Sequence, residues 1–238
     1  KNVKLEENPS NSNQNPGEGQ NWTVFAMDTV MQFDAYGGSA NLQEKVKRRV
    51  EELEGELSTT QENSDIFYLN QEKTAKLSDD TRYLMQEALA LGAETDGALD
   101  ISIYPVVQSW GFTTGNYRVP SESERESLLK SVDYRLVGLE ADTASIEPGM
   151  MVDLAGVGKG FTGDEVVKTM KEDGVTSALF SLGGNIQTIG TKPDGEKWYV
   201  GIKDPESDGY LGGVRCRMRR SLPPAAMSAI SRMMTEQF

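Results

Sequence analysis

Two spacings of hydrophobic residues occur along this chain, and together they restrict the folds that it can form. Apolar and polar residues alternate across 22–37, which is typical of half-buried strands, and two β-rich stretches, 176–190 and 198–205, are each broken by Gly or Pro where a strand should end. Apolar residues recur at helical spacing across 42–57 and 78–91. The strands and helices follow no regular βαβ period. The pattern therefore predicts an α+β fold, a single domain with a mainly antiparallel β-sheet and packed helices.

Local signals refine this pattern. The alternating segment 22–37 contains the turn-like Met27-Asp28-Thr29, which predicts a hairpin or two successive strands. Ser78 offers a side-chain N-cap to the second helix, and a weaker third helix is expected over Glu122–Lys130. A further helix after Gly160 is expected to pack against a sheet that contains 176–182 and 198–203.

Composition and charge exclude several classes of function. The 238 residues include 24 Lys and Arg against 37 Asp and Glu, so the net charge of -13 would repel a nucleic-acid backbone. The chain has no histidine, which excludes Ser-His-Asp and Cys-His catalysis and every His-based metal site. A single cysteine, Cys216, excludes an intrachain disulfide and a CxxC site. No apolar run approaches the roughly 18 residues of a membrane span.

Residues 1–21 are polar and contain almost no apolar side chains, so they cannot offset the entropy lost on ordering. We interpret them as a flexible tether. Such a leader is typical of an exported or lipid-anchored chain after its targeting segment is removed, although a cytosolic tail has a similar composition.

The segment 151–170 (MVDLAGVGKGFTGDEVVKTM) has the pattern with the clearest chemistry. A short apolar run ends at Asp153, glycines follow at 156, 158 and 160, and an amphipathic helix is predicted to begin near Thr162. Glycines let backbone amides approach an anion, a helix N-terminus adds about half a positive charge, and Lys159 adds a full one. The pattern predicts a phosphate cradle in which Asp153 orients a ligand or a metal. It matches neither a P-loop nor GxGxxG, and by itself it also fits an ordinary flexible loop.

Two further stretches have a structural and a functional interpretation. The segment 95–112 places Asp96 and Asp100 on either side of Gly97, ahead of apolar residues that lead into Trp-Gly-Phe. Alone it fits a turn followed by core aromatics. The strand at 178–182 ends in Gly-Gly-Asn, which alone predicts a hairpin turn.

Six blocks in order resemble one family, the ApbE-like FAD:protein FMN transferases, which are extracytoplasmic flavin-handling enzymes. The blocks run from about Phe25 to Pro205 and read AMDTVM, STTQENSDIFYLN, GALDISIYPVVQSWGF, VDLAGVGKGFTGD, ALFSLGGNI and WYVGIKDP. The departures are Met-Asp-Thr for Met-Gly-Thr, Ala155 for Gly and Gly158 for Ala. The resemblance implies an ApbE-like, T-fold-like domain.

The resemblance also implies an enzyme that transfers FMN from FAD to a Thr or Ser hydroxyl of a partner protein, requires Mg²⁺ and releases AMP. It assigns Asp153 and Lys159 to FAD and the carbonyl of Gly156 to Mg²⁺, and it assigns no catalytic residue. Further FAD contacts are expected from Met27 in the flavin pocket, from Thr60, where the family often has Tyr, and from Ala98, Leu99 and Asp100 on the adenosine or flavin side. A core role for Met27 and a solvated loop position for Lys159 are the structural alternatives.

Two other functions stay open. One is an FAD pyrophosphatase, in which water is the nucleophile and the products are FMN and AMP, and the other is a non-catalytic flavin-binding lipoprotein. The resemblance implies a flavin-acceptor partner with a Thr or Ser target, a subunit of a respiratory or redox membrane complex. It also implies an extracytoplasmic location, periplasmic or at the cell surface, with a lipid anchor in the inner membrane as the only membrane contact.

The resemblance ends after Asp204-Pro205, so the flavin transferase domain is expected over 22–211 and a non-family tail over 212–238. The family's Thr-Ser-Gly, His-Ile-x-Asp-Pro-x-Thr-Gly and Ala-Asp-Ala-x-Ser-Thr blocks are absent, and the last of these holds its metal site. Codon degeneracy permits the first missing block in another frame, so we hypothesise a frameshift near 212. A native basic tail is the alternative, although Pro223-Pro224 interrupts any helix there. The tail is expected to be disordered or irregularly packed, which makes the C-terminal part of the domain atypical or truncated.

Overall fold

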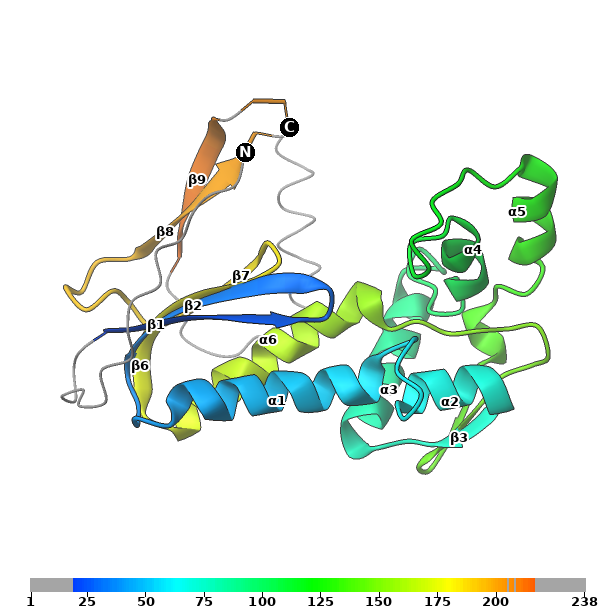
Figure 1. Cartoon of the computed structure of the whole chain (residues 1–238), viewed down its shortest axis with the longest axis horizontal. Helices are drawn as coiled ribbons and strands as arrows, with labels where there is room; N and C mark the ends of the chain where they lie inside the picture. The colour runs from blue at the N-terminus through cyan, green and yellow to red at the C-terminus, as the bar shows by residue number, and fades with distance from the viewer. Residues whose placement is uncertain (1–18, 205, 208, 217–238) are drawn as a thin grey trace. The chain divides into compact units, whose positions relative to one another are not determined.

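The structure is a computed structural model that describes residues 19–204, 206–207 and 209–216 (Figure 1). It confirms an α+β fold with antiparallel strand pairing. The described residues group into two compact units, one with 19–24, 30–47 and 167–216 and one with 25–29 and 48–166. The predictions for residues 1–18 and 217–238 lie outside the described residues.

A four-stranded sheet forms the centre of the first unit. Its strand order is β1-β2-β6-β7, with bounds β1 (Gly19–Ala26), β2 (Thr29–Gly37), β6 (Val175–Leu182) and β7 (Asn185–Ile189). Phe33 of β2 lies opposite Phe180 of β6, and Phe180 lies opposite Gln187 of β7, both in antiparallel register. The hairpin predicted across 22–37 is therefore confirmed.

The alternation of residues along β2 explains how this sheet buries one face. Met31, Phe33 and Ala35 are buried, whereas the intervening residues are more exposed, as the period of two along a strand requires. The Phe33 ring stacks on Trp22 at 5.0 Å and on Phe180 at 5.6 Å between ring centroids. Aromatic side chains from three strands thus pack in one row across the sheet.

The first strand begins inside the segment predicted as a tether. β1 starts at Gly19, and Gln20 is buried because its Nε2 donates to the carbonyls of Gly37 (3.4 Å) and Ser39 (3.3 Å). Polar composition alone predicts a tether through residue 21, but strand pairing and these bonds give the backbone of 19–21 a place in the sheet.

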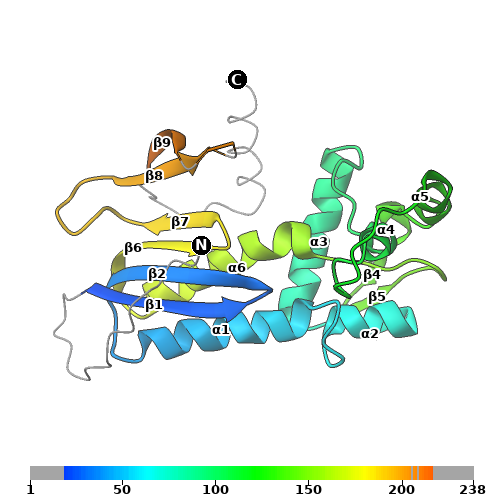
Figure 2. The ribbon, with the colours of Figure 1, turned by 45° about the horizontal axis from the view of Figure 1, so that its top comes forward.

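The strands β8 (Trp198–Lys203) and β9 (Tyr210–Cys216) form a separate two-stranded sheet (Figure 2). The prediction that 198–203 shares a sheet with 176–182 is wrong, because β8 pairs with β9 in antiparallel register, with Val200 opposite Val214. Residues 212–216, expected to be disordered or irregularly packed, form most of β9.

Helices and a small sheet form the second unit. The helices predicted over 42–57 and 78–91 are confirmed as α1 (Leu42–Leu57), whose first turns belong to the first unit, and α3 (Asp79–Glu94). The weaker helix is confirmed as α5 (Glu122–Leu129). The remaining elements are α2 (Asp65–Glu72), α4 (Tyr104–Ser109), a 3-10 turn (Tyr134–Leu136) and the sheet β3-β5-β4 from β3 (Thr74–Lys76), β4 (Gly138–Glu140) and β5 (Thr143–Ser145).

One buried apolar cluster stabilises this second unit. It joins the end of α1, α2, α3 and the start of α6 (Ala155–Glu172), through residues such as Leu53, Leu69, Leu84, Leu154 and Phe161. The predicted cap of α3 is present, since Ser78 Oγ accepts the Thr81 N–H at 3.3 Å. Helices of the described ranges are either too short or too polar to cross a bilayer.

The last third of α6 belongs to the first unit. Val167 and Met170 are buried there, and Figures 1 and 2 both show this end of the helix running beside β6. The predicted packing of the helix after Gly160 against a sheet that contains 176–182 agrees with this arrangement.

Candidate functional site

The glycine-rich segment is the beginning of a helix. α6 begins at Ala155, so the prediction of a loop that ends near Thr162 is wrong, and Gly156, Gly158 and Gly160 occupy the first turns. The reason is a local cap: Asp153 Oδ1 accepts the Ala155 N–H at 2.8 Å, and the Leu154 carbonyl accepts the Gly158 N–H at 2.7 Å. Neither bond depends on side chains within the glycine repeat.

Within the described ranges, one backbone N–H in the first turn of α6 has no hydrogen-bond acceptor. Leu154 also accepts the Val157 N–H at 3.0 Å, so Ala155, Val157 and Gly158 all have partners. The Gly156 N–H has none among the residues that the structure describes. A helix N-terminus carries partial positive charge, and its free N–H groups bind anions.

Lys159 stands three residues after Gly156, on the same side of the helix. It is half-buried and forms neither a hydrogen bond nor an ion pair within the described ranges. A lysine ammonium without a protein partner, beside a free helical N–H, can contact a phosphate.

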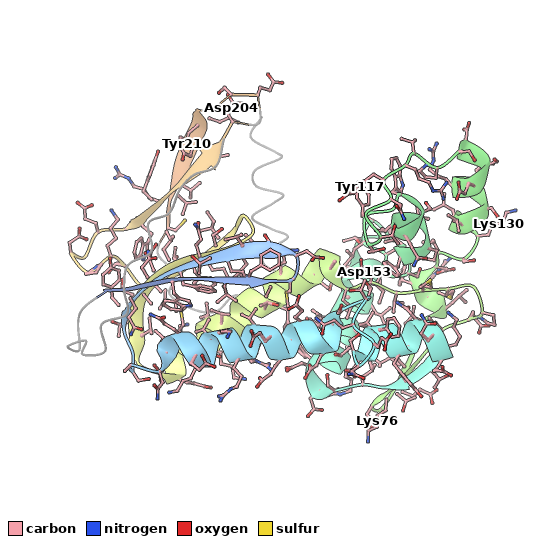
Figure 3. All side chains as sticks on the ribbon, viewed as in Figure 1. Lys76, Tyr117, Lys130, Asp153, Asp204 and Tyr210 are labelled. Carbon is pink, nitrogen blue, oxygen red and sulfur yellow. The ribbon has the colours of Figure 1, made fainter. Side chains whose placement is uncertain are left out.

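Asp153 lies directly before this helix (Figure 3). Burial raises the pKa of its carboxyl, while the Ala155 N–H and the charge of Lys159 act in the opposite direction. Asp153 also donates its backbone N–H to the Ile101 carbonyl at 2.8 Å. This bond ties the site to the loop that follows α3.

The loop 95–102 is held by the Asp100 carboxylate. One oxygen accepts the Ser102 N–H (2.8 Å) and hydroxyl (2.6 Å), and the other accepts the Tyr134 N–H (3.0 Å). Because three protein donors already use this carboxylate, its observed role is to fix the loop. Its predicted contact with FAD stays a prediction.

Ala98 and Leu99 occupy the same loop. Ala98 is exposed, and a Cβ placed on Gly156 would lie 3.5 Å from Leu99 Cδ1. The structure therefore brings Leu99 against the first turn of α6.

Met27 lies at the tip of the β1–β2 hairpin. Met27 and Asp28 have φ values of 51° and 54°, which is the conformation of a type I′ turn. The Met27 N–H donates to Glu54 Oε1 at 2.7 Å, and its sulfur lies 3.5 Å from Thr162 Oγ1 of α6. Its side chain also packs on the buried cluster of the second unit. The predicted flavin contact and the structural alternative therefore both remain compatible with its position.

Thr60 stands apart from these contacts. It is exposed on the connection between α1 and α2, and its hydroxyl lies 3.2 Å from Ser58 Oγ. The described contacts of Thr60 stay within this connection, so its predicted role in FAD binding stays a prediction.

The metal assignment rests on the carbonyl of Gly156. In the first turn of an α-helix this carbonyl is directed toward the N–H four residues later, so a cation would share or replace that bond. The described residues contain no group of three acidic or thiol side chains suited to a metal ion. Mg²⁺ is commonly bound through one or two carboxylates together with substrate phosphates and water, and Asp153, two residues before α6, is a carboxylate near this turn.

Comparison with known proteins decides the family. The sequence model of the ApbE family matches residues 27–228, which is most of the chain. The chain belongs to the ApbE family. The match includes 212–228, a segment that the motif comparison places after the family blocks.

The relatives are named for flavin transfer. A Vibrio cholerae FAD:protein FMN transferase is 29% identical over 176 residues, covering 71% of this chain and 53% of the relative. An Escherichia coli protein with the same name is 27% identical over 198 residues, covering 79% and 56%. The chain thus spans about half the length of the ApbE relatives it matches.

A solved structure confirms the ApbE fold. The crystal structure of the Thermotoga maritima ApbE protein has a TM-score of 0.78 and 25% identity, and it covers 84% of this chain and 68% of its own. The α+β architecture predicted from the sequence blocks is therefore that of the family.

One buried polar residue of this region is not predicted from the sequence. Asn70 is buried at the end of α2 and forms two hydrogen bonds to the backbone of Val152. A single Asn in an apolar helix has no periodic signature, and only its place in the Leu-Asn pair of the second family block could have singled it out.

Proposed function

We propose that this chain contributes the flavin-binding part of an FAD:protein FMN transferase, which transfers FMN to a Thr or Ser hydroxyl of a partner protein and releases AMP. One observation carries the proposal: the Gly156 N–H and the Lys159 ammonium lie on one side of the α6 N-terminus, and neither forms a hydrogen bond or an ion pair with the residues that the structure describes. Two adjacent positive groups of this kind suit the pyrophosphate of FAD.

The proposed reaction is a displacement at phosphorus. The acceptor hydroxyl oxygen attacks the phosphorus on the FMN side, and a new phosphoester bond forms. The bond from this phosphorus to the bridging oxygen breaks, AMP leaves with the electron pair, and the hydroxyl proton passes to solvent. Negative charge grows on the phosphate oxygens, so Lys159 and the helix N-terminus stabilise the transition state electrostatically.

Mg²⁺ is part of the proposal as well. A divalent cation bound to the diphosphate would neutralise its charge and polarise the bond that breaks. The Gly156 carbonyl is the proposed protein ligand, and phosphate oxygens of FAD and water would complete the coordination. Asp153 would orient FAD beside it.

The partner and the location are proposed on the family resemblance. The acceptor would be a subunit of a respiratory or redox membrane complex, and the chain would act outside the cytoplasm on a lipid anchor. These points do not depend on the geometry at α6.

Mass spectrometry tests the proposed function. The chain is incubated with FAD, Mg²⁺ and a panel of Thr-containing acceptor peptides, with Thr-to-Val peptides as the matched control. A gain equal to FMN less one water, found only on Thr peptides, is expected. Free FMN and AMP without that gain would indicate FAD hydrolysis instead. FAD that stays intact throughout would indicate a chain that binds flavin without catalysing transfer or hydrolysis.

A further inference from the structure

The side chain of Asn70 is bonded to the strand-like segment that leads into the candidate site. Its Nδ2 donates to the Val152 carbonyl at 2.8 Å, and its Oδ1 accepts the Val152 N–H at 2.7 Å. Asn70 is 3% exposed and Val152 is 0% exposed, so water does not compete for these bonds. The amide thus satisfies both backbone groups of one residue, as a neighbouring strand would.

The bonded residue stands next to Asp153. On the other side of the segment, the Asp153 N–H donates to the Ile101 carbonyl at 2.8 Å, and Met151 forms a parallel bridge with Ile103. The segment 151–153 is therefore held between the end of α2 and the loop after Asp100.

The end of α2 holds the preceding residues too. Lys73, with φ of 64°, caps α2, and its Nζ donates to the carbonyls of Asn70 (2.6 Å) and Met150 (3.0 Å). Lys73 supports the position of the Asn70 backbone. Among the described residues, the side-chain amide of Asn70 is the group that hydrogen-bonds the backbone of Val152.

We infer that Asn70 is a positioning residue for flavin binding, which acts by fixing Val152 so that Asp153 and the first turn of α6 keep their places. This inference rests on the proposed function. Without the amide, the buried N–H and carbonyl of Val152 lose their partners, and the segment gains freedom to move away from Ile101. The Asp153 carboxylate is then no longer held where it accepts the Ala155 N–H.

A double-mutant cycle on FAD affinity tests this inference with the full chain in Mg²⁺ buffer. Asn70→Ala and Asp153→Asn are each expected to raise the Kd for FAD about 10-fold or more, and the double variant little beyond the larger single effect. If the increase in Kd of the double variant equals the product of the two single increases, the two residues act independently and the inference is overturned. Should Asn70→Ala not fold, Asn70→Asp replaces it, because it keeps the acceptor for Val152 but loses the donor.

Ser78→Ala is the matched control. It removes the cap of α3 and so lowers stability, but Ser78 has no described contact with 150–155 and the Kd should stay unchanged. Equal losses of affinity in Ser78→Ala and Asn70→Ala would assign Asn70 a general structural role and overturn the inference.

Hydrogen exchange separates this inference from the proposed function. In the absence of FAD, Asn70→Ala should accelerate exchange at the Val152, Asp153 and Ala155 amides about 10-fold beyond any change in Ser78→Ala. If Asn70→Ala shows this acceleration while the wild-type chain fails to bind FAD, the positioning role is upheld and the proposed function is contradicted. Unchanged exchange at these amides would overturn the positioning even if FAD binds.

Discussion

The Asp153 carboxylate accepts the N–H of Ala155 at 2.8 Å, so this residue, which is predicted to contact FAD, also caps the helix that carries Gly156 and Lys159. Its carboxyl is buried enough to raise its pKa. The same side chain therefore connects the stability of α6 with the binding site, and the two roles can be separated by substitution.

Asp153→Asn should stabilise the protein at neutral pH and weaken FAD binding. Burial raises the pKa of Asp153 in the folded state, so the stability that the protonated form provides is lost as the pH rises through the folded pKa. Asn keeps a capping oxygen without a charge. Urea unfolding should show the variant more stable at pH 7, with the difference shrinking toward about pH 4.

The control for this pH dependence is Asp194→Asn, a change at an exposed carboxylate whose Oδ1 also accepts a backbone N–H, that of Glu196. It should give no gain in stability at pH 7. A gain in Asp153→Asn that stays constant from pH 7 to about pH 4 would contradict the assigned cause.

Gly160→Ala should raise stability and lower FAD affinity. A Cβ at Gly160 meets no atom within 4 Å, and alanine favours the helix by about 0.5–1 kcal/mol. Gly55 of α1 has the same open surroundings and provides the matched control. Both variants should unfold at higher urea concentration, but only Gly160→Ala should weaken FAD binding in a fluorescence titration. Equal FAD affinity in the two variants would indicate that a ligand does not approach this face of α6.

Asp28→Gly should stabilise the hairpin tip. Met27 and Asp28 both have positive φ, and a side chain costs about 1 kcal/mol there, whereas glycine does not. We expect a gain of about 0.5–1 kcal/mol in the free energy of unfolding, measured by urea titration. Asp28→Ala should bring no such gain, and a loss of stability on Asp28→Gly would show that the aspartate contributes contacts beyond the turn.

The elements with strong periodicity are the ones that the sequence predicts well. The alternation around Met27-Asp28 gives the hairpin, and Ser78 marks the start of α3 correctly. In both cases the turn or cap residues and the spacing of the buried residues predict the same element. The partner of β8 is not predictable in this way, because strand pairing joins segments through contacts that no local pattern records.

The start of α6 shows a different reason for failure. Three glycines lower helix propensity, so the sequence predicts a loop through Gly160. The cap from Asp153, together with the burial of Leu154 and Phe161, outweighs that propensity and extends the helix to Ala155. Candidate residues on this helix and on the loop before it could be named from the family blocks, but their arrangement around one helix end could not.

The central claim is that the α6 N-terminus binds the diphosphate of FAD, and the Kd for FAD of Lys159→Ala tests it most directly. Lys159 forms no hydrogen bond or ion pair in the described part of the chain, so removing its charge should change stability by little more than the loss of its attraction to the Asp153 carboxyl. Loss of a charge-assisted phosphate contact should raise the Kd about 10- to 100-fold. Lys130→Ala, at an exposed lysine after α5 (Figure 3), is the control and should bind FAD like the wild type. A Kd in Lys159→Ala equal to that of the wild type and of Lys130→Ala would contradict the account.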